Sequence, residues 1–389
     1  MKSRAICKIE LSLIALVKLA VKKATKTVFR LIGLKSKNNK ILVLAVSHIG
    51  DTICCIPALS LLREQYPNHK IDFFCSKPIV QFMKRNPFGV NVIGYDEKDV
   101  LLNLRLSLTL GWYNEIYVIW SKRDLLLAQA IGGHRIITTQ LIKSKSGILS
   151  SFVDEARKVI DTPTLEGSLC SAILRDPVDS NQKKELVFNH YHDKSLWGFN
   201  GSNNKNSIFL HPGTLGTSRL WSAKNWRNLA LLITAILRER ENQRDHLDLI
   251  FSGSGDFDMT FFNQIATSYD FRDCINQYTF DEFVQQLNNC KLLICVDTSV
   301  LHLAKLLEIN CIALLGGSKI ERICTSDYYK NSKITFLKSP YYCAEVNDIH
   351  CPNNLIKNCK HVSDGYSECM NNLTVESVVQ EVKKILNEQ

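Results

Sequence analysis

The segment "ILVLAVSHIGDTICCIPALSLLREQYP", Ile41 to Pro67, decides the fold class of this chain. It begins with an apolar run rich in β-branched residues, which stops at Ser47-His48-Ile49-Gly50-Asp51. From Thr52 to Tyr66 the apolar residues then recur at helical spacing. A buried strand that runs through a short turn into a helix is the repeating unit of a parallel α/β sheet.

The same alternation recurs along the chain and predicts two sheets. In the first half, "IDFFC" (71–75), "VNVIGY" (90–95) and "EIYVIW" (115–120) are short apolar runs separated by helical stretches. A second series starts at "SIFLHPG" (207–213) and continues through a helix at 224–240, "LDLIFSGSG" (247–255) and "KLLICVDTS" (291–299). We expect "CIALLGG" (311–317) to close this series.

The polar stretch 181–206, which ends in "GSNNKN", has the composition of a linker between the two series. The sequence therefore predicts two doubly wound Rossmann-like domains that face a cleft, an N-terminal one at 41–180 and a C-terminal one at 207–340. A cysteine-containing tail with a final amphipathic helix follows at 341–389. Ligands of open α/β sheets bind beyond the carboxyl ends of the strands, so the site is expected there.

The first 40 residues hold 11 of the 48 Lys and Arg residues and one of the 38 Asp and Glu residues, so they carry the whole net charge of +10. As a helix, this segment has an apolar stripe with most basic residues away from it, a pattern typical of a helix lying on an anionic membrane surface. The stripe consists of Leu13, Val17, Ala20, Ala24, Val28 and Leu31. A neutral body argues against nucleic acid as the partner of the whole protein.

Three other interpretations of this segment are a secretory signal, a membrane-spanning helix and a helix packed on the protein's own body. Lys18 interrupts the apolar core that a secretory signal needs, and the run from Leu13 to Val17 is far shorter than the roughly 20 residues of a spanning helix. A helix packed on the protein's own body stays open. The absence of an export signal favours a reduced cytoplasmic location, in which the fourteen cysteines are thiols. Several of them lie in apolar patterns and are expected to be buried small hydrophobes, namely Cys54, Cys55, Cys75, Cys295 and Cys311.

Asp51 lies where the first predicted strand gives way to its helix. It can be a helix N-cap, or a general base that points into the ligand space beyond the strand. From its position alone the two roles are equally supported. His48 and Gly50 stand beside it in the same turn.

The stretch "HPGTLGTSRLWSAKNW", His211 to Trp226, joins a strand end to a loop rich in Gly, Thr and Ser. Hydroxyls, exposed amides and the Arg219 guanidinium on one loop suit a phosphate group. The predicted binding residues are Thr214, Thr217, Ser218 and Arg219. Trp221 and Trp226 are instead expected to anchor the core.

A second anion site is predicted at "ICVDTSVLHLAKLLE", Ile294 to Glu308. A buried strand ends there in Asp297-Thr298-Ser299, and Thr298 and Ser299 can cap the following helix, whose amides would receive an anion. His302 falls in the first turn of this helix, where it can be a ligand contact or a packed polar residue.

Two weaker patterns are interpreted structurally. "DFD", Asp256 to Asp258, stands at a helix start, where capping is a better explanation than metal binding. Cys343, Cys351, Cys359 and Cys369 lack the close paired spacing of zinc sites, although a structural metal or a disulfide stays open. No metal ion and no cofactor is predicted from these patterns.

From Ile41 to about Leu386 the chain resembles the glycosyltransferase family that contains the bacterial lipopolysaccharide heptosyltransferases, family 9, which has the two-domain GT-B fold. The resemblance rests on "IGD" with "PALSLLREQYP", "HPG" with "SRLW", "VDTSVLHLAKLLE" and the ending "CMNNLTVESVV". It implies that Asp51 is the catalytic base, that Arg219 binds the donor diphosphate, and that Asp297, Thr298 and His302 contact the nucleotide sugar. The implied reaction is an inverting transfer of heptose from ADP-heptose to a lipid A-core acceptor at the inner membrane.

The sequence departs from the family pattern at two places. Ser299 stands where the family usually has Gly, and Ala45 to His48 lack the basic residue that many members have before "IGD". The departure at Ser299 bears on the identity of the donor, and the one at Ala45 to His48 bears on the identity of the acceptor. Three rivals therefore stay open: the same fold with another nucleotide sugar or core position, a GT-B-like sugar-nucleotide epimerase, and a membrane-associated binding subunit without turnover.

Overall fold

The computed structural model describes residues 39–46, 48–96, 113–118, 122–131, 133–139, 153–157, 194–199, 206–241, 247–266, 271–323, 333–340, 343 and 356–387. The chain divides into two compact units between Trp197 and Gly198. The basic amphipathic segment predicted at 1–40 lies almost entirely outside the described residues. Across the described part, no helix combines the length and the apolar character that crossing a membrane requires.

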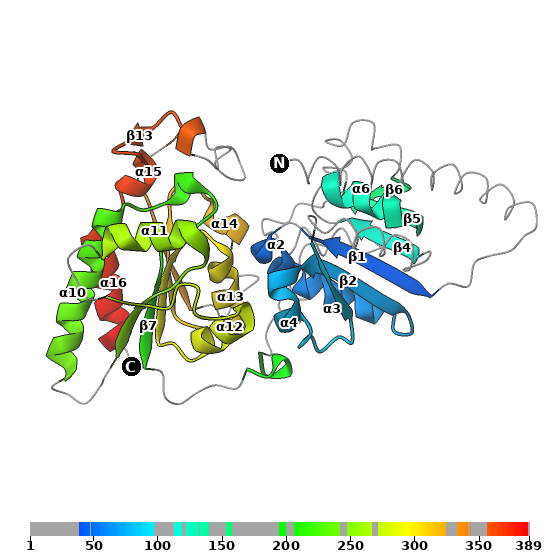
Figure 1. Ribbon diagram of the computed structural model, residues 1–389, viewed down its shortest axis with the longest axis horizontal. Helices are drawn as coiled ribbons and strands as arrows, with labels where there is room; N and C mark the ends of the chain where they lie inside the picture. Colours follow the sequence, from blue (N-terminus) through cyan, green and yellow to red (C-terminus); the bar gives the residue numbers. More distant parts are fainter. Residues whose placement is uncertain are drawn as a thin grey trace, which may run out of the picture. The chain divides into compact units, whose positions relative to one another are not determined.

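Unit 1 is built on a six-stranded parallel sheet with the order β3-β2-β1-β4-β5-β6 (Figure 1). Its strands are β1 (Lys40–Ala45), β2 (Lys70–Ser76), β3 (Asn91–Tyr95), β4 (Tyr113–Val118), β5 (Gly133–Thr139) and β6 (Glu155–Arg157). The helices between them include α2 (Ile49–Cys54), α3 (Ile56–Gln65), α4 (Val80–Met83) and α6 (Lys122–Ile131). Strands β1 and β4 are almost entirely buried because parallel strands are covered on both faces.

Unit 2 repeats this arrangement with the order β12-β11-β10-β7-β8-β9. Its strands are β7 (Ser207–His211), β8 (Asp248–Phe251), β9 (Arg272–Asp273), β10 (Leu292–Val296), β11 (Cys311–Leu315) and β12 (Ile334–Lys338). Its longer helices are α10 (Ala223–Glu241), α11 (Gly255–Ile265), α12 (Phe280–Asn288), α13 (Ser299–Leu307) and α16 (Val375–Asn387). The prediction of two doubly wound parallel sheets is confirmed, since in both sheets the strand order runs outward in two directions from a central pair of strands.

The prediction that "CIALLGG" closes the second series is wrong. Strand β12 continues the sheet and pairs in parallel with β11, from Cys311↔Ile334 to Leu315↔Lys338. The strand was missed because "ITFLK" is short and only partly buried, as expected for a strand at the edge of a sheet.

The helix after β1 also differs from the prediction. It begins at Ile49 instead of Thr52, and it is interrupted at Cys55, which separates α2 from α3. Pro57 explains the interruption, since it has no N–H to donate to the carbonyl four residues earlier. His48 is therefore the N-cap of α2 and Asp51 its third residue, so the N-cap interpretation of Asp51 is wrong.

The core of unit 2 includes both tryptophans of the predicted loop. Trp221 and Trp226 are fully buried and meet edge to face, with 5.4 Å between ring centroids. Trp221 Nε1 donates to the Leu373 carbonyl at 3.0 Å, so the loop after β7 is attached to the C-terminal segment. The expectation that these residues anchor the core is confirmed, as is the burial of the five cysteines in apolar patterns.

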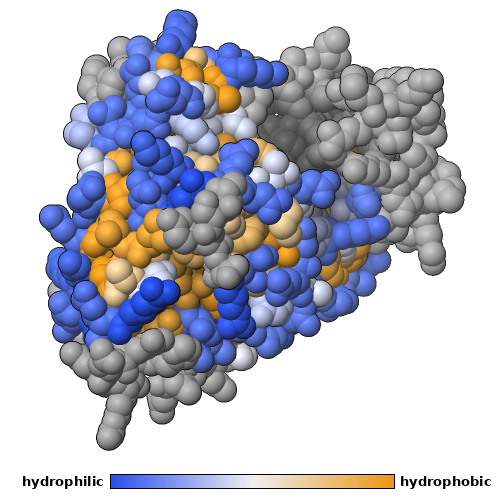
Figure 2. Space-filling model, turned by 60° about the vertical axis from the view of Figure 1, so that its left-hand side comes forward, coloured by the Kyte–Doolittle hydropathy of each residue, from blue (hydrophilic) through white to orange (hydrophobic). Residues whose placement is uncertain are grey.

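Helix α16 packs against α10 in the same unit and contributes Val378, Val382 and Leu386 to the core. Arg240 of α10 holds the end of α16 through the Leu386 carbonyl, at 2.9 Å. Figure 2, in which this side of unit 2 comes forward, shows a broad apolar area with hydrophilic residues around it.

Two buried carboxylates of unit 1 lie inside its sheet and are fully engaged there. Asp72 accepts hydrogen bonds from Asn91 Nδ2 at 2.6 Å and from the Tyr113 hydroxyl at 2.7 Å. Glu115 accepts from the Tyr66 hydroxyl at 2.6 Å and pairs with Arg135 at 2.8 Å. These partners compensate the cost of burying the charges, so both carboxylates are structural.

Candidate functional site

In each sheet the strand order reverses between two central strands, β1 and β4 in unit 1 and β7 and β10 in unit 2. Loops that leave neighbouring strands on opposite sides of such a point separate and leave room for a ligand. Asp51 follows β1, the Thr214–Arg219 loop follows β7, and Asp297 follows β10. All the predicted site residues therefore lie at the carboxyl ends of strands that flank a reversal point.

Arg219 and Asp297 meet across the reversal point of unit 2. Arg219 is the last residue of the short 3₁₀ turn η4 (Thr217–Arg219). In this turn Arg219 N donates to the Gly216 carbonyl at 2.8 Å. Its Nη1 donates to the Asp297 carboxylate at 3.0 Å and to the Asp297 carbonyl at 3.1 Å. The Arg219 side chain keeps 30% of its exposure, so the residue is held by Asp297 and is still partly open to solvent.

Two hydroxyl groups also converge on Asp297. Thr214 Oγ1 donates to the Asp297 carbonyl at 3.4 Å and accepts from Gly216 N at 3.2 Å. Ser318, which follows β11, donates to the Asp297 carboxylate at 2.5 Å. Asp297 thus joins the loops after three strands, β7, β10 and β11.

Sequence reasoning missed Ser318. The only signal was its position directly after the Gly pair that ends the "CIALLGG" run. Its partner Asp297 lies 21 residues earlier in the chain, and no spacing rule relates the two.

The other two hydroxyl residues of the loop face the C-terminal segment. Thr217 Oγ1 accepts from Ile356 N at 2.9 Å, and the Ser218 carbonyl accepts from the Ser367 hydroxyl at 2.6 Å. Ser218 is almost fully buried. These contacts buttress the loop that holds Arg219, and no contact of either residue with Asp297 is seen in the described part.

The start of α13 is the predicted anion site beside this group. Thr298 is its N-cap, with φ −151°, but the Thr298 side chain makes no capping bond. The expected side-chain cap is therefore wrong, and the cap bond seen is from Leu301 N to the Thr298 carbonyl, at 3.1 Å. Ser299 and His302 fall in the first turn, both partly buried. The dipole of this nine-residue helix favours an anion at its N-terminus.

The start of α11, by contrast, is already filled by a carboxylate. Asp258 accepts from Ser254 N at 2.7 Å, and burial raises the pKa of Asp258 above its ordinary value. A Cβ at Gly213 or at Gly253 would overlap the Asp258 carboxylate. The two glycines therefore make room for a resident anion, which confirms that "DFD" serves the helix start.

His211, the last residue of β7, lies beneath the loop. Its Nδ1 lies 3.0 Å from the Ser252 hydroxyl, and burial lowers the pKa of His211 from 6.5 to about 4. His211 is therefore neutral at pH 7 and adds no charge to the site.

In unit 1, Asp51 lies in the first turn of α2 and is partly buried, whereas His48 is exposed. The Thr52 hydroxyl, which is fully buried, contacts the Ala45 carbonyl at 3.2 Å and the His48 carbonyl at 3.1 Å. These bonds fix the start of α2 against the end of β1. Gly50 lies inside α2 and does not have a positive φ.

Residues 170–357 match the family model described as glycosyltransferase family 9 (heptosyltransferase). The chain is 22% identical over 360 residues to lipooligosaccharide heptosyltransferase 2 of Campylobacter jejuni serotype O:2, covering 89% of this chain and 98% of the relative. The enzyme of the same name from serotype O:6 is 26% identical over 192 residues, 47% of this chain and 52% of the relative. The solved structure of E. coli ADP-heptose lps heptosyltransferase II has a TM-score of 0.61 at 18% identity, covering 90% and 99% of the two chains. The chain is a glycosyltransferase, and its residues 170–357 are similar to family 9.

The part of this glycosyltransferase that matches the family model contains Arg219, Asp297 and Ser318, whereas Asp51 lies before it. The solved structure shares the fold over both units, and this agrees with the GT-B architecture that the motifs implied.

The late cysteines of the glycosyltransferase do not gather in the described part. Cys359 Sγ contacts the His361 carbonyl at 3.5 Å, and Cys369 Sγ contacts the Ser367 hydroxyl at 3.4 Å. Cys343 is partly buried, and Cys351 lies outside the described residues. Among the residues described, no group of three or more His, Cys, Asp or Glu side chains has the arrangement of a metal site.

Proposed function

We propose that this protein is an inverting glycosyltransferase that moves heptose from ADP-heptose to a lipopolysaccharide or lipooligosaccharide core acceptor. The observation that carries the proposal is the Arg219–Asp297 pair at the reversal point of unit 2, beside the start of α13. A fixed guanidinium next to a helix N-terminus is suited to a diphosphate. The names of the C. jejuni and E. coli relatives supply the sugar and the nucleotide.

In this proposal Arg219 and the first amides of α13 bind the donor diphosphate, and the Ser299 hydroxyl fixes its orientation. The Thr214 hydroxyl turns from the Asp297 carbonyl to donate to the diphosphate. Asp297 acts through Arg219, because its carboxylate is engaged by Arg219 Nη1 and by Ser318 Oγ. A carboxylate turned toward a diphosphate would repel it, so the role of Asp297 is to position the guanidinium. His302, in the first turn of α13, is assigned to the sugar nucleotide with Thr298.

Asp51 is the proposed catalytic base on the acceptor side, with His48 and Gly50. It takes the proton of the acceptor hydroxyl as that oxygen bonds to the anomeric carbon of the heptose. The bond from this carbon to the diphosphate oxygen breaks, and ADP leaves with the electron pair, its charge stabilised by Arg219 and by the α13 amides. One displacement inverts the configuration, and a cation with a helix terminus replaces a metal in neutralising the leaving group.

We further propose that residues 1–40 hold the enzyme at the anionic inner face of the membrane, where a lipid-linked acceptor resides. Flotation with vesicles with and without anionic lipid tests this directly. We expect binding to the anionic vesicles alone, and its loss when Lys18, Lys22, Lys23 and Lys26 are replaced by Gln, because each basic residue near such a surface contributes about 1 kcal/mol. Equal binding of the quadruple variant would refute this role.

The decisive experiment measures ADP release from ADP-heptose with and without truncated core lipopolysaccharide, for the wild type and for Asp51→Asn. We expect release that depends on acceptor, resists EDTA, and falls about 10²- to 10⁴-fold in kcat for Asp51→Asn at unchanged donor affinity. Conversion of the nucleotide sugar without acceptor would indicate an epimerase. Binding without turnover would indicate a binding subunit, and release from another nucleotide sugar would replace the donor.

A further inference from the structure

The charges at the carboxyl edge of the unit 2 sheet do not balance for the proposed donor. Arg219 is paired with Asp297, so together they add no net charge. His211 is neutral, and Asp258 already fills the start of α11. A nucleoside diphosphate sugar carries two negative charges. Of the groups named so far, only the N-terminus of α13 is left to neutralise them, with a partial positive charge of about one half.

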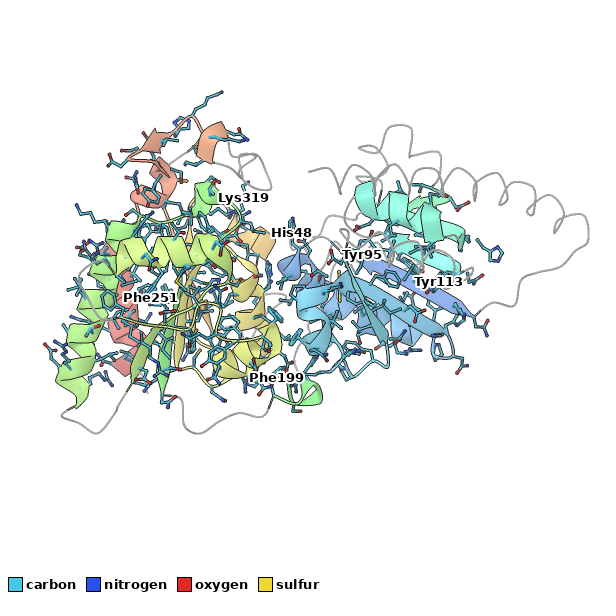
Figure 3. All side chains as sticks on the ribbon, viewed as in Figure 1. His48, Tyr95, Tyr113, Phe199, Phe251 and Lys319 are labelled. Atoms are coloured by element: carbon cyan, nitrogen blue, oxygen red, sulfur yellow. The ribbon has the colours of Figure 1, made fainter. Side chains whose placement is uncertain are left out.

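A second cation stands at the same edge. In the loops that directly follow β7, β8, β10 and β11, the basic residues are Arg219 and Lys319. Lys319, labelled in Figure 3, lies in the turn between β11 and α14 (Ile320–Ile323) and is partly buried. Its ammonium makes no ion pair with any residue in the described part of the chain.

The backbone of Lys319 is held close to the Arg219 group. The preceding residue, Ser318, is almost fully buried and bonds the Asp297 carboxylate at 2.5 Å. Consecutive Cα atoms are about 3.8 Å apart, so the Cα of Lys319 lies that distance from the Cα of Ser318, which bonds the same aspartate as Arg219. An ammonium group that no carboxylate of the described part engages is available to pair with a bound anion.

We propose that Lys319 is a further donor-binding residue, which pairs with the diphosphate of the sugar nucleotide opposite Arg219. This inference rests on the proposed function. The two cations then have different roles. Arg219, which is fixed by Asp297, orients the diphosphate, whereas Lys319 supplies a positive charge that no protein carboxylate of the described part compensates.

Titration calorimetry with ADP, UDP, GDP and CDP, and with adenosine, tests the proposal in the full-length protein. We expect Lys319→Met to weaken binding of the preferred diphosphate about tenfold and to leave the free nucleoside unaffected, since one charge-assisted contact is lost. Lys319→Arg should restore most of the affinity, and the wild type should lose affinity more steeply with salt than Lys319→Met.

Lys291→Met is the matched control, because Lys291 directly precedes β10 at the opposite edge of the same sheet. It removes the same charge and should bind as the wild type does. If Lys319→Met binds the preferred diphosphate like the wild type, the role of Lys319 is refuted while the proposed function stands. If the wild type prefers another nucleoside diphosphate, ADP-heptose is refuted as the donor. The affinities of Lys319→Met and of the wild type for that other diphosphate then test the role of Lys319. If the wild type binds none of them, both are refuted. Lys319→Gln provides a second readout should the Met variant fold poorly.

Discussion

Arg219 Nη1 lies 3.0 Å from the Asp297 carboxylate, across the point where the strand order of unit 2 reverses. The two residues are 78 positions apart in the chain. The contact fixes the guanidinium of a side chain that keeps 30% of its exposure, at the carboxyl edge of a parallel sheet. It is the centre of the candidate site because the Thr214 and Ser318 hydroxyls bond the same aspartate.

Replacing Arg219 should weaken donor binding strongly. For Arg219→Met we expect the KM for the nucleotide sugar to rise about 30- to 100-fold, the loss of about 2–3 kcal/mol from charged hydrogen bonds. Steady-state kinetics with varied donor measure it. Arg272→Met is the control, since Arg272 pairs with Asp248 at an exposed position and should leave KM unchanged. An unaltered KM in Arg219→Met would remove this residue from the donor site.

The direction of the Asp297→Asn effect distinguishes two roles of the carboxylate. If it positions Arg219, the variant should bind ADP about three- to tenfold more weakly, because the guanidinium loses a charged partner. If the carboxylate faces the diphosphate, removing its charge should tighten binding instead. Titration of ADP decides between them, and Ser318→Ala should shift affinity in the same direction as Asp297→Asn but by less.

The glycines around Asp258 predict a coupled stability effect. Gly213→Ala should destabilise unit 2 by about 1–3 kcal/mol, because the new methyl overlaps the Asp258 carboxylate. In Gly213→Ala with Asp258→Ala this cost should largely disappear, since the obstacle is gone. Denaturant unfolding of the two single variants and the double variant measures the coupling energy. If the losses of the two single variants add in the double variant, the cost of Gly213→Ala does not come from the Asp258 carboxylate.

Burial of His211 predicts a pH dependence of stability. The pKa of His211 is about 4 in the folded protein, below its ordinary value of 6.5, so the unfolded chain takes up a proton first as the pH falls. The contribution is fully present above pH 6.5 and is lost as the pH falls toward 4, by about 2 kcal/mol at pH 5. Denaturant unfolding at pH 7 and pH 5 should show this loss in the wild type and a smaller one in His211→Gln. An equal loss of unfolding free energy between pH 7 and pH 5 in both proteins would mean that groups other than His211 cause it.

The sequence predicted the order of strands and helices well because that signal is local. Apolar runs such as Ile41–Ala45 and Leu292–Val296 are buried on both faces of a parallel sheet and carry their pattern in consecutive residues. The break at Cys55 and the edge strand β12 were missed, since a proline inside a helical pattern and a half-exposed strand both weaken that periodicity.

By itself, then, the sequence determined the two parallel sheets, the burial of Trp221 and Trp226, and the loops in which Asp51, Arg219 and Asp297 stand. Only the tertiary structure decided that Arg219 is held by Asp297, that Ser318 shares this carboxylate, and that Asp258 occupies the space beside Gly213 and Gly253. The physical reason is the range of the interactions. Periodicity and loop composition act over a few neighbouring residues, whereas these contacts depend on which strand ends the fold brings together.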